Sequence, residues 1–558
     1  MTNTFEDIAQ QAKLLFIIGS NTTEQHPIFG MQLRQAVKQR GVPLIVADPR
    51  RIPITQFATI HLRHRPGTDT ALLNGLMNVL VTEDLYDKEF VAARTEGFEE
   101  LRDRLAEYTP EYVQEITGVP AEKIRQAARL MAATKPGALM YAMGITQHTS
   151  GVGNVMSCAN LQMLLGNLGV PGGGVNPLRG QSNVQGACDM GGLPNVYSGY
   201  QSIALEASHK KFEAAWGAVP PADKPGLTVV EMMNAAEQGK VRAMYIFGEN
   251  PMLSDPDINH VRHCLEALDF LVVQDIFMTE TAQLADVVLP GASFAEKEGT
   301  FTNSERRVQP LRRALDPLGE SRPDWEILAE IGARTLALTG QAKAAAEAPH
   351  GGWEYLNPAE VLDEIAALTP SYAGIRHGRL AHAPKGLQWP CPGEDHPGTP
   401  ILHVGKFARG LGKLTPVDWL PPPELPDAEY PLLLTTGRVL WHYHTGTQTR
   451  RSGGLSAIAP EGYIEMHAED AARLDVTTDD MVEVKSRRGQ VNVKVEITEK
   501  VQPGVVFMTF HFAESAANLL TNASALDPVA KIPGFKVSAV RVTKLSPDGA
   551  PAGVCESC

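Results

Sequence analysis

The N-terminal part of the chain alternates short apolar runs with longer stretches in which apolar positions recur at helical spacing. Residues 13–19 (KLLFIIG) and 43–48 (PLIVAD) are almost wholly apolar, and residues 28–40 between them have a helical pattern. Strands of this composition are buried on both faces, because helices cover both sides of a parallel sheet. The pattern therefore predicts an α/β fold, with further elements at 120–134 (helix), 137–143 (strand) and 151–168 (helix).

The pattern changes twice in the rest of the chain. A second α/β stretch begins near residue 226 and continues to about 340, and eleven prolines then fall between Pro384 and Pro431. Short strands separated by turn residues follow at 463–467, 481–486, 490–497 and 504–511, which predicts a β-barrel. The predicted domains are 1–180 and 181–345 (both α/β), a Pro-rich arm at 346–428, a barrel at 429–545 and a tail at 546–558.

Composition and charge narrow the class of protein. Hydrophobic residues make up 43% and charged residues 20% of the 558 positions, which is ordinary for a globular protein. The net charge of −14 argues against nucleic acid and anionic membrane as partners, because both bind basic surfaces. No apolar run is long enough for membrane insertion, and the first residues lack the pattern of an export signal. Six scattered cysteines form no disulfide framework, so we expect a cytoplasmic, multidomain enzyme.

Two strand ends share a Gly-x-Asn sequence, with a proline eight residues after the glycine. The residues are Gly19, Asn21 and Pro27 in the first copy and Gly248, Asn250 and Pro256 in the second. Each copy leads through a helix to a strand that ends in aspartate, Asp48 or Asp275. Glycine lets the backbone approach a pyrophosphate at a helix start, and the acid accepts hydrogen bonds from ribose or base. The repeat predicts two nucleotide-bearing ligands, although two turns that merely need Gly and Asn remain an alternative.

Residues 171–191 (PGGGVNPLRGQSNVQGACDMG) are rich in glycine and side-chain amides and poor in apolar residues. Such a run offers backbone N–H groups and side-chain donors to a polar ligand. Arg179 within it is a planar double donor suited to a carboxylate. An arginine in a Gly-rich loop is also often a surface or phosphate-contacting residue, and composition alone leaves both roles open.

The run from Arg179 to Gly191 closely resembles the substrate-side loop of molybdopterin-dependent formate dehydrogenases. Related nitrate and arsenite enzymes share the Gly-rich approach but not the sequence NVQGACDMG. Nearly the whole chain resembles this family, with a loose match only at 340–425. The other matching segments are GSNTTEQHP (19–27), DPR (48–50), GTD (67–69), MGITQ (143–147), FGENP (247–251), VVQDIFMTETAQLADVVLP (272–290), EGTFTNSERRVQ (298–309), TTGRVLWHYH (435–444) and IPGFKVSAVRV (532–542).

The resemblance implies a fold, a cofactor and a reaction. The expected fold has two Rossmann-like domains that bind pterin nucleotides and a C-terminal double-psi β-barrel-like domain. The expected cofactor is molybdenum or tungsten held by two molybdopterin guanine dinucleotides (bis-MGD). The expected protein is a catalytic subunit that converts formate to carbon dioxide by reversible two-electron transfer, with an iron–sulfur electron-transfer subunit as partner.

The resemblance also assigns residues to these ligands. One nucleotide is expected to contact Gly19, Asn21, Asp48, Arg50, Gly67, Asp69 and Gly144. The other is expected to contact Gly248, Asn250, Gln274 and Asp275, and Asp324 is expected at a guanine. The barrel residues expected to close over the pterins are Arg438, His442, Asn518, Phe535 and Lys536. Arg179 would hold the formate carboxylate while the C–H bond breaks, and Gln181 is the second expected catalytic residue.

The chain departs from the family in its cysteines. The family's N-terminal region has four cysteines for a [4Fe–4S] cluster, then a cysteine or selenocysteine metal ligand, whereas the first cysteine here is Cys158. We therefore assign no metal ligand within this chain and expect the cluster and ligand upstream. Our hypothesis is that an in-frame UGA for selenocysteine was read as a stop and Met1 as the start; the alternative is a separate N-terminal polypeptide. In both cases we expect the isolated chain to expose an unpaired strand edge and apolar surface, and not to oxidise formate.

Several other residues have expected roles, and two other functions are alternatives. We expect Cys188 to pack, Cys555 and Cys558 to lie in a mobile tail, and His26 and His148 to be structural, with His148 also a candidate for the active-site wall. One alternative function is another bis-pterin oxidoreductase of the nitrate reductase type, against which NVQGACDMG speaks. The other is a non-catalytic scaffold subunit of a redox complex, against which Arg179 and both nucleotide loops speak.

Overall fold

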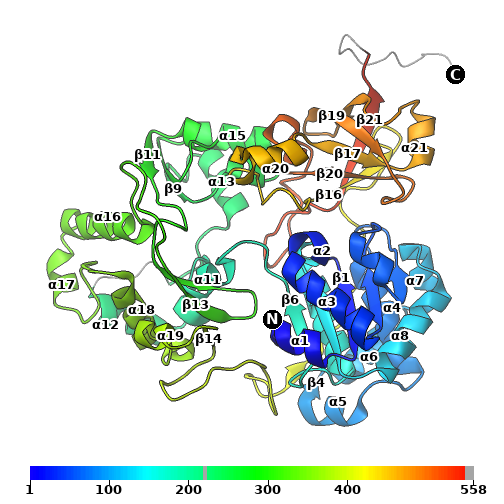
Figure 1. Cartoon of the computed structure of the whole chain (residues 1–558), viewed down its shortest axis with the longest axis horizontal. Coiled ribbons are helices and arrows are strands. Elements are labelled where there is room, and N and C mark those ends of the chain that lie inside the picture. The colour runs from blue at the N-terminus through cyan, green and yellow to red at the C-terminus, as the bar shows by residue number, and fades with distance from the viewer. Residues whose placement is uncertain (218–222, 547–558) are drawn as a thin grey trace. The chain divides into compact units, whose positions relative to one another are not determined.

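Segments that lie far apart in the chain combine into two units in the computed structural model, which describes residues 1–217 and 223–546. The first unit contains Met1–Leu178, Asn250–His263 and Ile401–Cys558, and the second contains Arg179–Glu249 and Cys264–Pro400. The second unit is mainly green and yellow-green in Figure 1. The chain has a mixed α/β fold with a closed barrel near its C-terminus. Cys555 and Cys558 lie outside the described residues.

Five parallel strands form the first sheet, in the order β3-β2-β1-β5-β6. They are β1 (Leu14–Ile18), β2 (Leu44–Ala47), β3 (Ile60–Leu62), β5 (Gly137–Tyr141) and β6 (Val175–Pro177). Strands β1, β2 and β5 confirm the predictions from the apolar runs, and each is buried along its whole length. Because all five strands run the same way, the loops after β1, β2 and β5 lie at one edge of the sheet.

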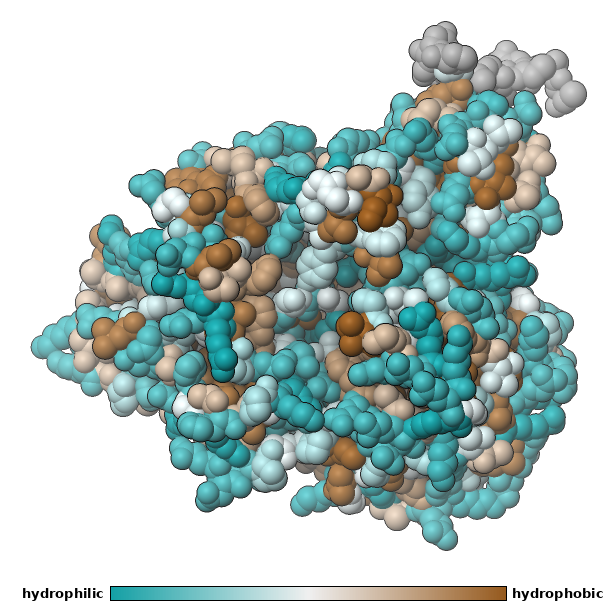
Figure 2. Space-filling view, viewed as in Figure 1, coloured by the Kyte–Doolittle hydropathy of each residue, from teal (hydrophilic) through white to brown (hydrophobic). Residues whose placement is uncertain are grey.

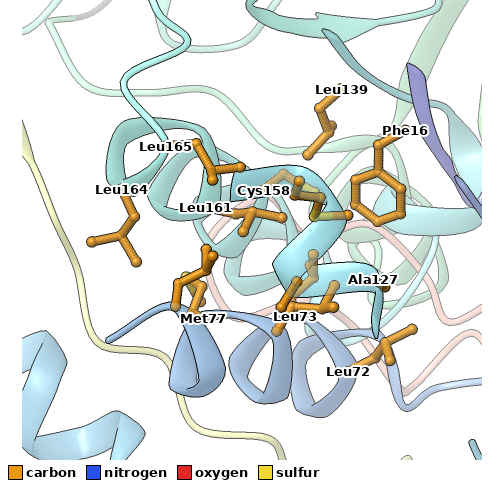
Figure 3. Packing of buried hydrophobic residues seen from close by; sticks show 14 of the residues in the cluster. Phe16, Leu72, Leu73, Met77, Ala127, Leu139, Cys158, Leu161, Leu164 and Leu165 are labelled. Atoms are coloured by element: carbon orange, nitrogen blue, oxygen red, sulfur yellow. The ribbon is translucent and has the colours of Figure 1, made fainter. Parts of the chain in front are cut away.

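Helices cover both faces of this sheet. Phe16 and Ile18 of β1 point into one core, and Leu15 and Ile17 point into another, because successive side chains of a strand alternate between faces. Figure 3 shows the first core, in which Phe16 lies among leucines and Cys158. The continuous apolar runs of the sequence are thus explained by burial on two sides.

The helices around the sheet have the apolar spacing that the sequence predicts. In α8 the buried residues Ile124, Ala127, Ala128 and Met131 recur every three or four positions, so one stripe faces the core. The helices are α1 (Phe5–Gln11), α2 (Thr22–Gln25), α3 (Pro27–Arg40), α4 (Asp69–Thr82), α5 (Lys88–Arg94), α6 (Phe98–Leu105), α7 (Pro110–Thr117), α8 (Ala121–Ala133), α9 (Met143–Thr146) and α10 (Gly151–Leu164).

The second unit contains a parallel and an antiparallel three-stranded sheet. The parallel sheet has the order β11-β10-β9 and consists of β9 (Ala243–Phe247), β10 (Phe270–Asp275) and β11 (Val287–Pro290). The antiparallel sheet consists of β12 (Gly299–Thr302), β13 (Arg307–Leu311) and β14 (Leu387–Gln388). The longer helices of this unit are α12 (Glu206–Trp216), α13 (Val229–Glu237), α16 (Asp324–Leu338) and α18 (Pro358–Leu368), and the shorter ones are α11 (Val184–Asp189), α17 (Ala342–Ala346) and α19 (His377–Ala381).

The C-terminal barrel confirms the prediction of many short strands. Six strands close in the order β16-β20-β17-β19-β18-β21 around a core that is mainly valine, leucine and methionine. They are β16 (Leu432–Gly437), β17 (Tyr463–Met466), β18 (Met481–Lys485), β19 (Gln490–Ile497), β20 (Val505–Thr509) and β21 (Ser538–Lys544), with α20 (Gly453–Ile458) and α21 (Ala468–Arg473) in the connections. Closure pairs every strand and leaves no open edge. The short α14 (Pro251–Ser254) belongs to the same unit, and α15 (Ile258–Glu266) continues from it.

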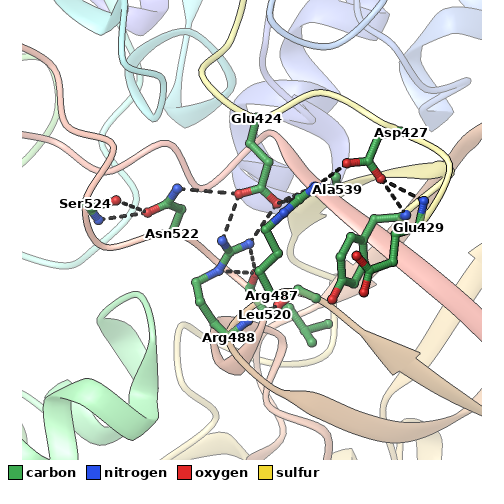
Figure 4. A network of polar contacts seen from close by, with 11 residues as sticks. Glu424, Asp427, Glu429, Arg487, Arg488, Leu520, Asn522, Ser524 and Ala539 are labelled. Atoms are coloured by element: carbon green, nitrogen blue, oxygen red, sulfur yellow. Dashed lines mark hydrogen bonds and ion pairs between the residues drawn. The ribbon is translucent and has the colours of Figure 1, made fainter.

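The Pro-rich segment is fastened to the barrel by a partly buried carboxylate. Glu424 accepts hydrogen bonds from Arg488 Nη1 and Nη2 at 2.8 and 2.9 Å and from the Ala539 amide at 2.8 Å (Figure 4). Burial raises the pKa of Glu424, but the hydrogen bonds from Arg488 and Ala539 and the charges of Arg488 and Arg487 together outweigh it, and the pKa is lowered overall. Arg487 also contacts Glu424 and donates to Asp427. The segment therefore enters β16 along a fixed path.

Apolar side chains gather on one face of the β9–β11 sheet. Tyr245, Phe247, Phe270 and Val287 are all exposed, and the strand register places them on the same face. Elsewhere Figure 2 shows mostly polar residues, in teal, with scattered brown patches, which is usual for a protein surface. Among the described residues, no helix has the length and apolar character of a membrane span.

The core of the first sheet yields a matched stability prediction. We expect Ile45→Ala, at a site with 0% exposure in β2, to reduce the free energy of unfolding by about 2–5 kcal/mol, because it leaves a cavity. Ile28→Ala, at a site with 69% exposure in α3, should change it by less than about 0.5 kcal/mol. Hydrogen exchange of the β1 and β2 amides measures both. Equal effects of the two substitutions would contradict the described packing.

Candidate active site and cofactor-binding loops

Two glycines hold the carboxyl ends of β1 and β5 together. Gly19 follows β1 with φ of +57°, and the amide of Gly144, which follows β5, donates to the Gly19 carbonyl at 3.0 Å. A Cβ at Gly144 would lie 2.6 Å from that carbonyl oxygen, so a larger residue would force the two loops apart. Backbone rather than side chains therefore lines this sheet edge, which is the arrangement expected of a phosphate-binding loop.

Buried polar atoms without partners follow Gly19. Asn21 Oδ1, Thr23 Oγ1 and Gln25 Nε2 make no hydrogen bond within the described part of the chain. Buried polar groups in proteins nearly always have a partner, so three such atoms in five residues indicate that a polar ligand belongs here. This loop fits a nucleotide-bearing cofactor.

Arg50 ties the loop after β2 to the barrel. Its Nε and Nη2 donate to Glu465 at 3.1 and 2.6 Å, and its guanidinium lies 3.4 Å from the centre of the Phe507 ring. Asp48, two residues earlier, accepts from the Arg50 amide at 2.9 Å, and burial raises the pKa of its carboxyl group. These two predicted residues therefore lie at the same sheet edge as Gly19.

Asp69, at the start of α4, pairs with a histidine that no motif singled out. Its Oδ1 lies 2.9 Å from His64 Nε2, and its Oδ2 lies 3.7 Å from His148 Nε2. Burial raises the pKa of Asp69, but the charge and hydrogen bond of His64, together with the charge of His148, outweigh it, and the pKa is lowered overall. Gly67 has φ of +80°, and a Cβ there would lie 2.5 Å from Pro422, so the Pro-rich segment packs closely on this turn.

The barrel places the positively charged side chain of Lys536 near Asp48. Lys536 Nζ donates to the Thr436 carbonyl at 2.8 Å, and Thr436 Oγ1 donates to the Phe535 carbonyl at 2.9 Å. Burial and the nearby charge of Arg438 lower the pKa of Lys536 to about 7, against the attraction of Asp48. An ammonium group held in this way gains stability from an anionic ligand, because the ligand favours the protonated form.

His442 and Asn518 make their hydrogen bonds inside the protein. His442 Nε2 donates to the Ala459 carbonyl at 2.7 Å. Asn518 Nδ2 donates to the Leu253 carbonyl at 2.8 Å, and so holds the turn that follows Asn250 against the barrel. Both side chains shape predicted ligand loops through these internal contacts.

The predicted residues Gly248, Gln274, Asp275 and Asp324 form a cluster at the end of β10, whereas Asn250 belongs to the first unit. The Gly248 amide donates to the Gln274 carbonyl at 2.9 Å, and Gln274 Nε2 donates to Asp324 Oδ1 at 2.7 Å. Asp275 Oδ1 accepts from the Ile276 amide at 2.6 Å and so shapes the loop after the strand. A Cβ at Gly248 would meet no atom within 4 Å, so the space beside this loop is open.

Two residues missed by the sequence analysis complete this cluster. Lys297 Nζ donates to Asp324, and the Tyr245 hydroxyl donates to Gln274 Oε1. Lys297 is 27 residues from Asp324 in the chain, so its place became evident only from the fold. The one sequence signal for it was its position beside the motif at 298–309.

The Gly-rich loop holds Arg179 through its own side chains. Arg179 Nε donates to Gln185 Oε1 at 3.2 Å, and Nη1 donates to Cys188 Sγ at 3.4 Å. The loop is fastened to β12, because Asn183 Oδ1 accepts from the Thr302 amide at 2.9 Å. The guanidinium is thus held from two sides, and Cys188, which was expected only to pack, makes a polar contact with it.

The remaining candidates lie close to these loops. The Gln181 carbonyl accepts from the Val184 amide at 3.4 Å at the start of α11. The His26 carbonyl accepts from the Gly30 amide at 2.7 Å in the first turn of α3, and His148 Nε2 donates to the Gly144 carbonyl at 2.8 Å. Across residues 1–217 and 223–546, no three His, Cys, Asp or Glu side chains gather in a way that could hold a metal ion.

The parallel sheet with its glycine edge and the closed barrel define an α/β protein with a C-terminal barrel domain. The chain belongs to the molybdopterin oxidoreductase family. Residues 1–334 match the family described as Molybdopterin oxidoreductase, and residues 432–539 match the Molydopterin dinucleotide binding domain. The second match covers most of the barrel, which extends from β16 to β21.

Curated relatives include formate dehydrogenases. The F420-dependent formate dehydrogenase 1 subunit alpha of Methanococcus maripaludis is 49% identical over 548 residues, which cover 98% of this chain and 78% of the relative. Formate dehydrogenase H of Escherichia coli is 39% identical over 553 residues, covering 98% and 74%. The assimilatory nitrate reductase catalytic subunit of Bacillus subtilis is more distant, at 35% over 552 residues, covering 97% and 76%.

A solved structure with much lower sequence identity has the same fold. Acetylene hydratase from Pelobacter acetylenicus superposes with a TM-score of 0.73 at 22% identity, covering 97% of this chain and 78% of that one. At this identity the likeness concerns the fold alone. The α/β and barrel arrangement therefore persists where the sequence has largely diverged.

Lys536 yields a prediction about pH. Its pKa in the folded chain is about 7, below the ordinary value of about 10.4, so between these values the unfolded chain binds a proton that the folded chain lacks. This lysine therefore makes the cofactor-free protein least stable below pH 7 and more stable as the pH rises towards 10. We expect Lys536→Met to stabilise the protein most at pH 6 and to lose that advantage by pH 10, as measured by urea unfolding.

Lys13→Met, at an exposed position of the same unit, serves as the control and should leave the pH profile unchanged. A constant difference between Lys536→Met and the unsubstituted chain from pH 6 to 10 would rule out the low pKa.

Proposed function

We propose that this chain is the catalytic subunit of a molybdenum or tungsten formate dehydrogenase, which converts formate to carbon dioxide in a reversible two-electron reaction. The observation that carries the proposal is the Arg179 guanidinium, held by Gln185 and Cys188 within a Gly-rich loop. The kinship with proteins named formate dehydrogenase supports it.

Arg179 suits formate because the substrate is a planar carboxylate with a single C–H bond. A guanidinium binds a carboxylate through paired N–H donors, and this contact also sets the direction of the C–H bond. Holding that direction before reaction removes much of the entropy cost of the step. Gln181, in the same loop, is proposed as a second polar contact for the substrate.

We propose that two pterin guanine dinucleotides bind the loops described above, on Rossmann-like sheets and a double-psi type barrel. Gly19, Asn21, Asp48 and Gly144 would line one nucleotide, and the Gly248, Gln274 and Asp324 cluster would line the other. The remaining residues proposed to contact the cofactors are Arg50, Gly67, Asp69, Asn250, Asp275, Arg438, His442, Asn518, Phe535 and Lys536. When bound, the metal–pterin group accepts the two electrons, a chemistry that side chains do not supply.

Two other functions are less well supported. A nitrate reductase type of activity is favoured only by a more distant relative. A scaffold that lost its metal would not need the unpartnered Asn21, Thr23 and Gln25 atoms beside the glycine edge, since these atoms call for a ligand. Formate oxidation remains the function that the site supports best.

We further propose that the [4Fe–4S] cluster and the cysteine or selenocysteine ligand are supplied by residues outside these 558, and that electrons leave through an iron–sulfur subunit. The position of the first cysteine, Cys158, supports this, because that thiol is buried in the core rather than near a loop. The free, buried thiols of Cys158 and Cys391 support a reducing, cytoplasmic compartment.

Substitution of Arg179 tests the proposed substrate contact. In the formate-oxidising form of the enzyme, Arg179→Gln should lower kcat/KM for formate about 10- to 100-fold, because a charged hydrogen bond to the carboxylate contributes about 1.5–3 kcal/mol. Arg313→Gln, in the same unit and half exposed, should leave kcat/KM unchanged. Equal kcat/KM values for the two variants would show that Arg179 does not contact the substrate.

The 558-residue chain by itself should bind the cofactor without turning over formate. We expect it to carry two guanine nucleotides per chain, measured after acid release, together with molybdenum or tungsten, and to show no formate-dependent dye reduction. Robust turnover by this chain would contradict the need for further residues. A chain free of pterin and metal would favour the scaffold function.

A further inference from the structure

A buried aspartate next to the Arg179 loop is surrounded by four hydrogen-bond donors. Asp189 Oδ1 accepts from Gln185 Nε2 at 2.7 Å and from the Tyr200 hydroxyl at 2.9 Å. Its Oδ2 accepts from the Tyr372 hydroxyl at 2.5 Å and from Trp389 Nε1 at 2.6 Å. The side chain has 0% exposure, so these donors replace the water that a carboxylate needs.

The aspartate determines which way the Gln185 amide points. An ionised carboxylate only accepts hydrogen bonds, so the group of Gln185 that faces Asp189 must be its NH₂. The Gln185 carbonyl then faces the opposite way, where it accepts from Arg179 Nε at 3.2 Å. With the amide reversed, its NH₂ would face an N–H of Arg179, and neither contact would be a hydrogen bond.

We propose that Asp189 is a positioning residue that acts through Gln185 to fix the orientation of the Arg179 guanidinium. Asp189 need not touch the substrate for this role, because it acts on the residue that holds Arg179. The inference deepens the proposed function, on which it rests for the identity of the carboxylate substrate.

Two of the donors, Tyr372 and Trp389, come from segments that are held independently of the Gly-rich loop. Tyr372 is buried in the core formed by Leu362, Ile375 and Leu380. The backbone at Trp389 is held by Arg306, whose side chain is buried and donates to the Trp389 and Thr399 carbonyls. Asp189 is thus anchored to a rigid frame, and that frame sets the position of Gln185.

Asp189→Asn replaces one accepting oxygen with an NH₂ donor and keeps the size of the side chain. It therefore tests the direction of the hydrogen bonds alone. Asparagine offers one acceptor oxygen, and when this accepts from Tyr372 and Trp389, its NH₂ faces Gln185. The Gln185 amide must then turn its carbonyl towards that NH₂, which leaves two donors opposed at Arg179. In the formate-oxidising enzyme we expect the KM for formate to rise about tenfold, with a smaller change in kcat.

A second substitution should restore the arrangement. A glutamate in place of Gln185 accepts on both of its oxygens, one from the asparagine NH₂ and one from Arg179 Nε. We therefore expect Asp189→Asn/Gln185→Glu to recover most of the lost affinity for formate, with the same total charge as the original chain. If Asp189 had only a structural role, a second substitution at Gln185 would not restore the affinity for formate. Recovery therefore requires that residue 189 acts on Arg179 through the side chain at position 185.

A chemical readout makes the test independent of activity. Phenylglyoxal modifies arginines at a rate that depends on their accessibility, and mass spectrometry of the purified chain reports the rate at Arg179, with Arg313 as internal reference. We expect Asp189→Asn to raise the rate at Arg179 about threefold or more and the double variant to return it, because the hydrogen bond that holds the guanidinium is lost and then recovered. Tyr372→Phe should act in the same direction more weakly.

Tyr197→Phe is the matched control for Tyr372→Phe, because Tyr197 is buried in the same unit and its hydroxyl bonds to no other described residue. It should leave Arg179 unchanged. No change at Arg179 in Asp189→Asn, or a change that Gln185→Glu does not reverse, overturns the inference. If the enzyme oxidises no formate in any form, the proposed function fails, and the phenylglyoxal rates still decide the role of Asp189.

Discussion

Burying a charge in a protein costs several kcal/mol unless donors or opposite charges surround it, and this constraint organises both units. In the first unit Glu465 accepts from Arg50 and from Lys500, so the barrel meets the loop after β2 around one carboxylate. In the second unit Asp189 gathers donors from three separate segments. Each carboxylate fixes the relative positions of the elements that contribute donors, because losing one donor would leave a buried charge under-satisfied.

The cofactor loops combine a close approach of two backbone segments with a local positive charge that the net charge of the chain does not reveal. Gly19 and Gly144 approach so closely that side chains are excluded, and the atoms left unpartnered are polar. The chain as a whole is acidic, with a net charge of −14, yet the charge of Lys536 interacts with both Asp48 and Arg438 near this edge. The net negative charge of the chain repels anions only weakly, because solvent and salt screen charges that lie far apart. Buried cations a few ångströms from a bound anion are little screened, so an acidic protein can still bind an anionic ligand at this edge.

The Pro-rich part of the chain, which resembles the family only loosely, supports the parts that resemble it closely. Within the second unit it supplies Tyr372 and Trp389 to the carboxylate beside the Arg179 loop. Within the first unit it supplies Glu424 to the barrel and packs Pro422 on the turn at Gly67. Its proline content predicted an extended connection, but it could not predict these contacts, since they depend on partners far away in the chain.

The sequence by itself determined strands β1, β2 and β5 of the first sheet, the barrel, the paired Gly-x-Asn loops and the motif around Arg179, because local periodicity and glycine requirements are written in neighbouring residues. The strands β3 and β6 of the same sheet were not predicted and became evident only from the fold. The family followed from those motifs, and the family comparisons agree. The tertiary structure alone decided that His64 pairs with Asp69, that Lys297 joins Asp324 and that Asp189 stands behind Gln185. These contacts satisfy buried polar groups, and a buried group's partner is chosen by where the chain folds rather than by what lies next to it in sequence.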